Sequence, residues 1–286
     1  MLSIDPSEIS TKKLHGFLLS SVAPRPIAFA STIDKEGRPN LSPFSFFNVF
    51  SANPPILIFS PARRVKDNTT KHTYENAKAT REVVINIVNY PMVQQMSLAS
   101  TEYAEGVNEF IKAGFTMLKS EKVVPFRVAE SPVQLECKVN DIIELGDEGG
   151  AGNLIICEVL KLHIDEQYLN EKGEINQEKL DLVARAGGSF YSRAKQGFFE
   201  IPKPLQNLGI GFDELSNEIK NSAVLTGNDL GLLANIEKIP SKSDVDKFTI
   251  EHGDYVGSNS IKKHTFAKTF LDKNDVISAW KVLLMK

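Results

Sequence analysis

Residues 133–140 of the chain read Val133-Gln-Leu-Glu-Cys-Lys-Val-Asn140. Apolar residues occupy the odd positions and polar residues the even ones, so one face of the predicted strand lies in a core and the other in water. Strands with one solvated face are typical of antiparallel sheets. A glycine-rich turn at residues 146–150 follows, and residues 154–164 are predicted to return as a longer, more buried strand. This part of the sequence therefore predicts an antiparallel hairpin.

Further predicted strands lie closer to the N-terminus. Residues 27–33 and 40–47 flank a turn in which Gly37 can adopt positive φ, and residues 56–59 and 83–88 are short apolar runs. Six or more strands with few helices favour a mainly β fold, an antiparallel barrel, over a doubly wound parallel sheet. No G-x-G-x-x-G segment follows the first predicted strand and no glycine-rich loop ends in Gly-Lys-Ser/Thr, which excludes the common nucleotide-binding folds.

The composition of the 286 residues is that of an ordinary globular protein, with 42% hydrophobic and 24% charged residues. A net charge of -3 gives no general attraction for nucleic acid or for an anionic membrane. No apolar run approaches the length of about 18 residues that a membrane-spanning helix requires, so we expect a cytoplasmic protein. The two cysteines and five histidines show no metal-binding spacing, and no metal site is expected.

The character of the sequence changes after Pro202-Lys-Pro204. Residues 212–222, 228–236 and 275–286 are predicted helices, and the last of them carries the only tryptophan, Trp280. Residues 239–260 are rich in Lys, Asp, Ser and Gly and are expected to form a polar linker. We therefore expect a β-barrel domain at residues 1–203 and a helical extension at residues 204–286, packed on the barrel or on a partner subunit.

The candidate binding residues lie mainly between Asn40 and Thr70. Residues 40–48 read Asn40-Leu-Ser-Pro-Phe-Ser-Phe-Phe-Asn48 and mix aromatic side chains with Ser and Asn, as expected beside a flat polar ring. Residues 60–70 offer hydroxyl groups and positive charge at the start of a helix predicted from Thr69 to Thr80, where free N–H groups attract anions. The stretch therefore predicts a ligand with a flat heteroaromatic ring and a phosphate. The candidates for the phosphate are Ser60, Lys66, Asn68, Thr69 and Thr70; the alternative is that the Ser and Thr residues only cap the helix.

Arg25 is a further candidate site residue. It lies between Pro24 and Pro26, which hold the backbone extended, so its side chain projects from a stiff segment. Such an arginine suits a binding site, and an ordinary surface arginine at a strand start is the alternative.

Several segments, in this order along the chain, resemble the flavin reductase-like family, whose members bind FMN in a split β-barrel. The resemblance covers residues 20–202 and depends on the order of the segments, because no single one is diagnostic. The segments are Arg25-Pro-Ile-Ala-Phe-Ala-Ser-Thr32, Asn40 to Asn48, Pro54-Pro-Ile-Leu-Ile-Phe-Ser60 with Lys66-Asp67, Gly106-Val-Asn-Glu-Phe110 with Ala113-Gly-Phe115, Val128 to Cys137, and Val183-Ala-Arg-Ala-Gly-Gly-Ser-Phe-Tyr191.

The resemblance implies a homodimer that binds FMN near the subunit interface. It implies that Ser45 and Asn48 approach the flavin ring, and that Arg185 and Tyr191 lie near the mouth of the pocket. It also implies that Ser60 and the loop at residues 66–70 hold the phosphate. Asn68 stands where the family pattern has threonine, so either Thr69 or Thr70 would supply the hydroxyl.

The activity that the resemblance implies is hydride transfer from NAD(P)H to flavin. The protein would be an NAD(P)H-dependent flavin reductase, or the reductase component of a two-component monooxygenase with an oxygenase partner. Because the cofactor carries the chemistry, no catalytic residue is expected. Three alternatives stay open: a non-catalytic FMN-binding electron carrier, a ferric reductase that uses bound flavin, and an interaction module that has lost its ligand.

Overall fold

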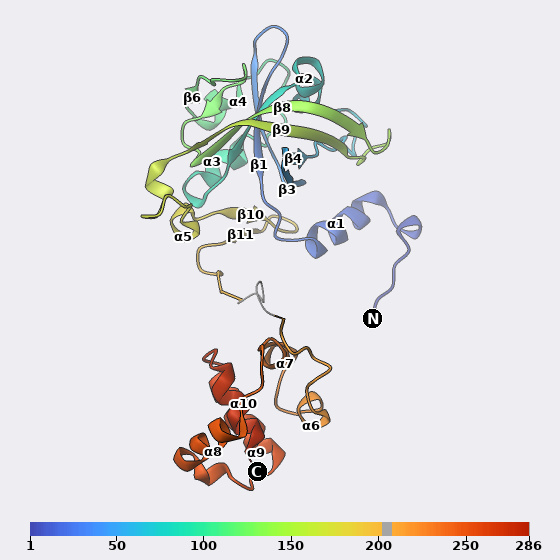
Figure 1. Cartoon of the computed structure of the whole chain (residues 1–286). Coiled ribbons are helices and arrows are strands. Elements are labelled where there is room, and N and C mark those ends of the chain that lie inside the picture. Colours follow the sequence, from blue (N-terminus) through green and yellow to red (C-terminus); the bar gives the residue numbers. More distant parts are fainter. Residues whose placement is uncertain (202–207, 286) are drawn as a thin grey trace. The chain divides into compact units, whose positions relative to one another are not determined.

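The computed structural model describes residues 1–201 and 208–285 of the chain (Figure 1). The chain divides into two compact units, Met1–Phe199 and Glu200–Lys286. The expected boundary between residues 203 and 204 lies outside the described residues. No helix in the described ranges is long and apolar enough to cross a lipid bilayer.

The first unit contains a seven-stranded sheet with the order β2-β1-β5-β8-β9-β4-β3, and all neighbouring strands in it are antiparallel. The predicted hairpin is formed by β8 and β9, which pair from Val133 with Ile164 to Glu144 with Asn153. The expected antiparallel sheet with peripheral helices is confirmed. The strands are β1 (Ala28–Ile33), β2 (Pro39–Phe44), β3 (Phe47–Ala52), β4 (Pro55–Phe59), β5 (Glu82–Ile87), β8 (Val133–Glu144) and β9 (Asn153–Ile164).

Helices and two short strand pairs surround this sheet. The α-helices are α1 (Thr11–Ser21), α2 (His72–Thr80), α3 (Val93–Leu98), α4 (Glu109–Ala113) and α5 (Gln177–Leu180), and the 3-10 turns are η1 (Pro6–Glu8), η2 (Tyr90–Met92) and η3 (Glu166–Tyr168). The strand pairs are β6 (Met117–Leu118) with β7 (Arg127–Val128), and β10 (Val183–Arg185) with β11 (Tyr191–Arg193).

The start of α2 differs from the prediction. The expected helix begins at Thr69, but α2 begins at His72 with Lys71 as its N-cap residue. Asn68 adopts the left-handed region with φ 56°, which a right-handed helix cannot include. The N–H of Thr69 donates to the carboxylate of Asp67 at 3.1 Å, so this segment closes a turn of its own before the helix begins.

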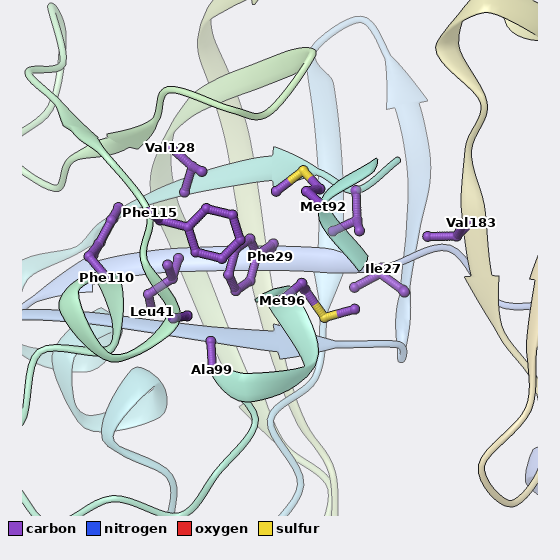
Figure 2. Close-up of a cluster of buried hydrophobic side chains, with 12 residues drawn as sticks. Ile27, Phe29, Leu41, Met92, Met96, Ala99, Phe110, Phe115, Val128 and Val183 are labelled. Atoms are coloured by element: carbon purple, nitrogen blue, oxygen red, sulfur yellow. The ribbon is translucent and has the colours of Figure 1, made fainter. Parts of the chain in front are cut away.

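Every residue of β1 is buried, so both faces of this strand are covered. On one face, Phe29 packs edge-on against Phe115 with ring centroids 5.2 Å apart, in a cluster that also contains Met96 of α3 and Phe110 of α4 (Figure 2). On the other face, β1 contributes the small side chains of Ala28 and Ala30 to a second cluster. The sheet is therefore a rigid layer whose ends and loops remain available for binding.

The two cysteines are buried in the second cluster and are free thiols. Burial raises the pKa of the Cys137 thiol to about 12, so this thiol stays neutral and unreactive at physiological pH. No group of three or more His, Cys, Asp or Glu side chains among the described residues could hold a metal ion.

The second unit is helical. Residues 239–260, expected as a polar linker, instead contain α8, which starts with a capping box between Ser241 and Asp244 and buries Val245. Trp280 is 2% exposed and its Nε1 donates to the carbonyl of Leu233 at 2.9 Å, so its burial requires neither the barrel nor a partner subunit. The helices are α6 (Asn217–Lys220), α7 (Gly227–Ala234), α8 (Lys242–Glu251), α9 (Ser260–Leu271) and α10 (Val276–Leu284), with the 3-10 turn η4 (Gly253–Tyr255).

His264 of α9 is a buried polar group inside this helical unit, with 3% of its surface exposed. Its Nδ1 lies 2.8 Å from the hydroxyl of Ser222, and its Nε2 has no hydrogen-bond partner among the described residues. Burial lowers the pKa of His264, although the carboxylate of Glu218 acts in the opposite direction. The imidazole is therefore held in its neutral form.

Candidate functional site

Three adjoining cavities on the barrel unit form the candidate site. The central cavity has a volume of about 260 Å³, the tyrosine cavity about 130 Å³ and the cationic cavity about 40 Å³. The central and tyrosine cavities share Pro43, Phe44 and Ser45 at the end of β2, and all three cavities share Ser100. The cationic cavity meets the central one at Lys71.

Ser60 is the clearest binding residue of the central cavity. It follows β4 directly, and its N–H donates to the carbonyl of Phe46 at 2.8 Å, which fixes its backbone. Its hydroxyl is buried and has no hydrogen-bond partner among the described residues. A buried polar group without a partner costs stability, so this hydroxyl fits a ligand that hydrogen-bonds to it. The structure thus places Ser60 in the lining of the central cavity, and its role in binding stays a prediction.

Ser45 and Arg25 are brought together, but only Ser45 lines the cavities. The Nε of Arg25 donates to the Ser45 hydroxyl at 3.4 Å. The same guanidinium donates to the carbonyls of Leu19, Val22 and Ala186, and burial lowers its pKa. Arg25 therefore connects the end of α1 to the loop after β10, and its hydrogen bond helps to orient the Ser45 hydroxyl.

Arg185 and Tyr191 line the tyrosine cavity together with Ser45. They face each other across the β10–β11 pair, and the guanidinium carbon of Arg185 lies 4.6 Å from the centroid of the Tyr191 ring. A cation held over an aromatic face is attracted by the ring and keeps both side chains in place. The structure thus brings these two predicted residues together in the cavity that adjoins the central one.

The predicted phosphate loop is largely engaged in its own hydrogen bonds. Asn68 accepts from Arg63 at 2.6 Å and donates to the carbonyl of Asp147 at 2.9 Å. The Thr69 hydroxyl donates to Asp67 at 2.6 Å, and the Thr70 hydroxyl donates to Glu75. These polar groups close the turn before α2. The alternative that the Ser and Thr residues cap the helix is wrong, because Lys71 is the N-cap residue of α2 and no side chain among the described residues caps it.

Lys66 and Asn48 are exposed, and neither is among the described lining residues of the three cavities. The Asn48 side chain accepts from the N–H of Val49 at 2.8 Å, on the edge strand β3. Their roles toward a ligand therefore stay predictions.

Arg64 and Lys71 supply the positive charge of the cationic cavity. This cavity also contains His72 and Thr73, the first residues of α2, whose first turn has no side-chain cap among the described residues. Glu102 accepts hydrogen bonds from Arg64 Nε and Lys71 Nζ, both at 2.9 Å. Lys71 and Arg64 together lower the pKa of Glu102, so the carboxylate is charged. Two cations at the start of a helix thus already hold an anionic group.

Glu109 is a second carboxyl group beside this cavity. It is 4% exposed and accepts from the N–H of Leu41 at 3.1 Å. Burial raises the pKa of Glu109, although the bond from Leu41 lowers it. A carboxyl group that is less readily ionised leaves more of the positive charge of the cavity available to a ligand.

Sequence reasoning missed several lining residues: Ser42, Arg64, Lys71 and Ser100. Arg64 lies two residues before Lys66 in the basic segment Arg63-Arg64-Val65-Lys66, so its signal was the same as that of Lys66, and Lys71 follows the predicted loop directly. Ser42 lies in the stretch assigned to ring contact. Ser100 follows α3, far along the chain, and carried no signal.

A larger cavity of about 300 Å³ lies beside Arg38. None of the predicted site residues is among its described lining residues. The charge of Arg38 is already paired with Asp34, Glu36 and Glu105. We therefore place the candidate site at the three adjoining cavities.

Comparison with known proteins assigns the class. The profile of the Flavin reductase like domain matches residues 19–180. An uncharacterized protein of Aquifex aeolicus is 38% identical over 181 residues, which are 63% of this chain and 90% of that protein. An uncharacterized protein of Halalkalibacterium halodurans is 34% identical over 199 residues, which are 69% of this chain and 94% of that protein. The chain belongs to the flavin reductase-like family, as the resemblance predicted.

Solved structures agree with this assignment. Nitrilotriacetate monooxygenase component B from Bacillus cereus has a TM-score of 0.65 and 32% identity, covering 71% of this chain and 98% of its own. The 2-nitrobenzoate 2-nitroreductase NbaA of Pseudomonas fluorescens has a TM-score of 0.65 and 23% identity, covering 73% and 100%. A Shewanella frigidimarina protein described as a flavin reductase with a split barrel domain has a TM-score of 0.60 and 23% identity, covering 71% and 100%. The first unit has the split-barrel fold that was expected.

Proposed function

We propose that the protein binds FMN in the three adjoining cavities and transfers hydride from NAD(P)H to flavin. It would act as a flavin reductase, or as the reductase component of a two-component monooxygenase. The observation that carries this proposal is the adjacency of two environments. A cavity lined by Ser45, Phe44 and Ser60, whose buried hydroxyl has no partner among the described residues, meets a cationic cavity at the start of α2.

The residues present fit FMN. Arg64, Lys71 and the N–H groups at the start of α2 would hold its phosphate, because a phosphate needs positive charge and several donors. Ser60 would donate to the flavin or its ribityl chain, and Pro43 with Phe44 would exclude water from the ring. Bound FMN would supply the acceptor of the hydride and the carrier of the electrons.

The remaining task of the chain is to admit a nicotinamide beside the flavin. Arg185 and Tyr191 are placed for this, since they line the tyrosine cavity that adjoins the central one. The guanidinium would neutralise part of the charge of an anionic co-substrate, and the ring would present an apolar face to it. Ser45 is held toward both cavities by Arg25.

The test is flavin binding followed by turnover. Purified protein is titrated with FMN, and oxidation of NADH and NADPH is then followed with free flavin as the acceptor. Binding together with NAD(P)H oxidation supports the proposal. Binding without oxidation favours the alternative of an electron carrier that a partner reduces. No change in flavin absorbance and no rise in melting temperature with FMN would contradict both. A homodimer, an oxygenase partner and a cytoplasmic location stay predictions.

A further inference from the structure

The segment that connects α3 to α4, residues 100–107, carries two carboxylates that face cations of the barrel; we name it the acidic loop. Glu102 contacts Arg64 and Lys71, and Glu105 lies 3.2 Å from Arg38. The acidic loop also has short-range hydrogen bonds, such as Tyr103 N to the Thr101 carbonyl at 2.9 Å. The ion pairs of its two carboxylates therefore contribute to holding it against the barrel.

Glu102 lies where an anionic ligand of the site would be held. It lines the cationic cavity together with Arg64, Lys71 and the first residues of α2. A carboxylate and a phosphate are both anions that only accept hydrogen bonds, and both satisfy the same donors. The Glu102 side chain is 60% exposed, so its carboxylate can leave this position with little loss of packing.

We propose that Glu102 is an internal competitor for the phosphate of FMN. This inference rests on the proposed function. The carboxylate gives up its contacts with Arg64 and Lys71 when the phosphate binds, and it returns to them when the flavin leaves. Glu102 therefore sets how strongly the site prefers phosphorylated over unphosphorylated flavin, and it eases release of FMN.

An opposing role can be drawn from the same contacts. Glu102 could hold Arg64 and Lys71 in the geometry that a phosphate requires, in which case its loss would weaken binding. The two roles predict opposite signs for the same substitution, and this makes them separable. The amide of glutamine keeps the size of the side chain and one oxygen acceptor but removes the charge.

The experiment compares Glu102→Gln with Glu105→Gln. Both substitutions remove one negative charge from the same loop, but Glu105 contacts Arg38 and not the two cations of the site. The dissociation constants of FMN and riboflavin are measured by quenching of flavin fluorescence at fixed ionic strength. Riboflavin is the matched ligand because it lacks only the phosphate.

Glu102→Gln is expected to tighten FMN binding about tenfold, which corresponds to about 1.4 kcal/mol, and to leave riboflavin binding unchanged. Glu105→Gln is expected to leave the ratio of the two affinities as in the natural protein. Weaker FMN binding by Glu102→Gln, an unchanged ratio, or an equal change for both ligands would overturn the inference alone. Failure of the natural protein and both variants to bind either flavin would overturn the proposed function as well.

Discussion

Replacing Lys71 by alanine should weaken FMN binding by about 10- to 100-fold. Lys71, Arg64 and Glu102 form one cluster of two positive charges and one negative charge. Loss of Lys71 removes the net positive charge of this cluster, because Glu102 then neutralises Arg64. A hydrogen bond to a charged group contributes about 1.5–3 kcal/mol, and every 1.4 kcal/mol is about tenfold in affinity. Riboflavin, which lacks the phosphate, should bind Lys71→Ala and the natural protein equally well.

Lys66→Ala is the matched control for this substitution. It removes the same charge five residues earlier in the same basic segment, from an exposed side chain outside the described lining of the cavities. The assay is a titration of FMN and of riboflavin against each variant, read by flavin fluorescence at one ionic strength. The reasoning is refuted if Lys66→Ala weakens FMN as much as Lys71→Ala, a result that would return the phosphate to the loop at residues 66–70. It is also refuted if Lys71→Ala weakens both flavins equally.

Three further predictions concern stability and assembly. Because burial lowers the pKa of His264, the unfolded state binds protons more readily, and the helical unit should lose stability as pH falls below 6.5. Fluorescence of Trp280 during urea unfolding measures the free energy of unfolding at each pH. His264→Gln should make this free energy less dependent on pH, and an unchanged pH dependence in the variant would contradict the prediction. Asn68→Ala should lower the free energy of unfolding by about 1–3 kcal/mol, more than Asn68→Gly, which tolerates positive φ; equal losses would show that the backbone conformation does not matter. Phe50 is 63% exposed on the edge strand β3, so Phe50→Asp should convert the predicted dimer to a monomer in light scattering; a monomeric natural protein would rule this interface out.

The antiparallel sheet could be predicted because its pattern is local. Alternation within residues 133–140 is a property of consecutive positions, and Val133, Cys137 and Val139 are buried as it predicts. The expected solvated face is wrong at Gln134 and Glu136, which are buried: Gln134 donates to the carbonyls of Val128 and Ser131, and Glu136 accepts from the N–H groups of Glu121 and Lys122. Two predictions were wrong, the start of α2 at Thr69 and the polar linker at residues 239–260, because composition does not show how individual residues are used. Asn68 adopts positive φ, so a separate turn is completed there before the helix begins. Residues 239–260 are polar on average, but they contain a capping box and a buried valine that start and anchor α8.

Some predicted residues line the candidate cavities because their own strand or turn places them there. Ser60 directly follows β4, Ser45 follows β2, and Arg185 pairs with Tyr191 across a tight strand pair; their roles in binding stay predictions. Ser100 could not be found, because only the packing of α3 brings it beside the end of β2, more than fifty residues earlier in the chain.

The stretch from Ser60 to Thr70 shows that the number of polar residues in a segment overestimates how many of them can bind a ligand. The polar groups of this turn are first satisfied by one another and by neighbouring segments: Asn68 donates to the carbonyl of Asp147, Thr69 to Asp67 and Thr70 to Glu75. The donors left for a ligand are those with no competing acceptor, such as the Ser60 hydroxyl, or those whose present acceptor is the exposed carboxylate of Glu102, such as Arg64 Nε and Lys71 Nζ. The sequence shows which hydrogen-bond donors are present, whereas the hydrogen bonds within the fold determine which of them remain available to a ligand. On this reasoning we propose that Lys71, rather than Lys66, contacts the phosphate.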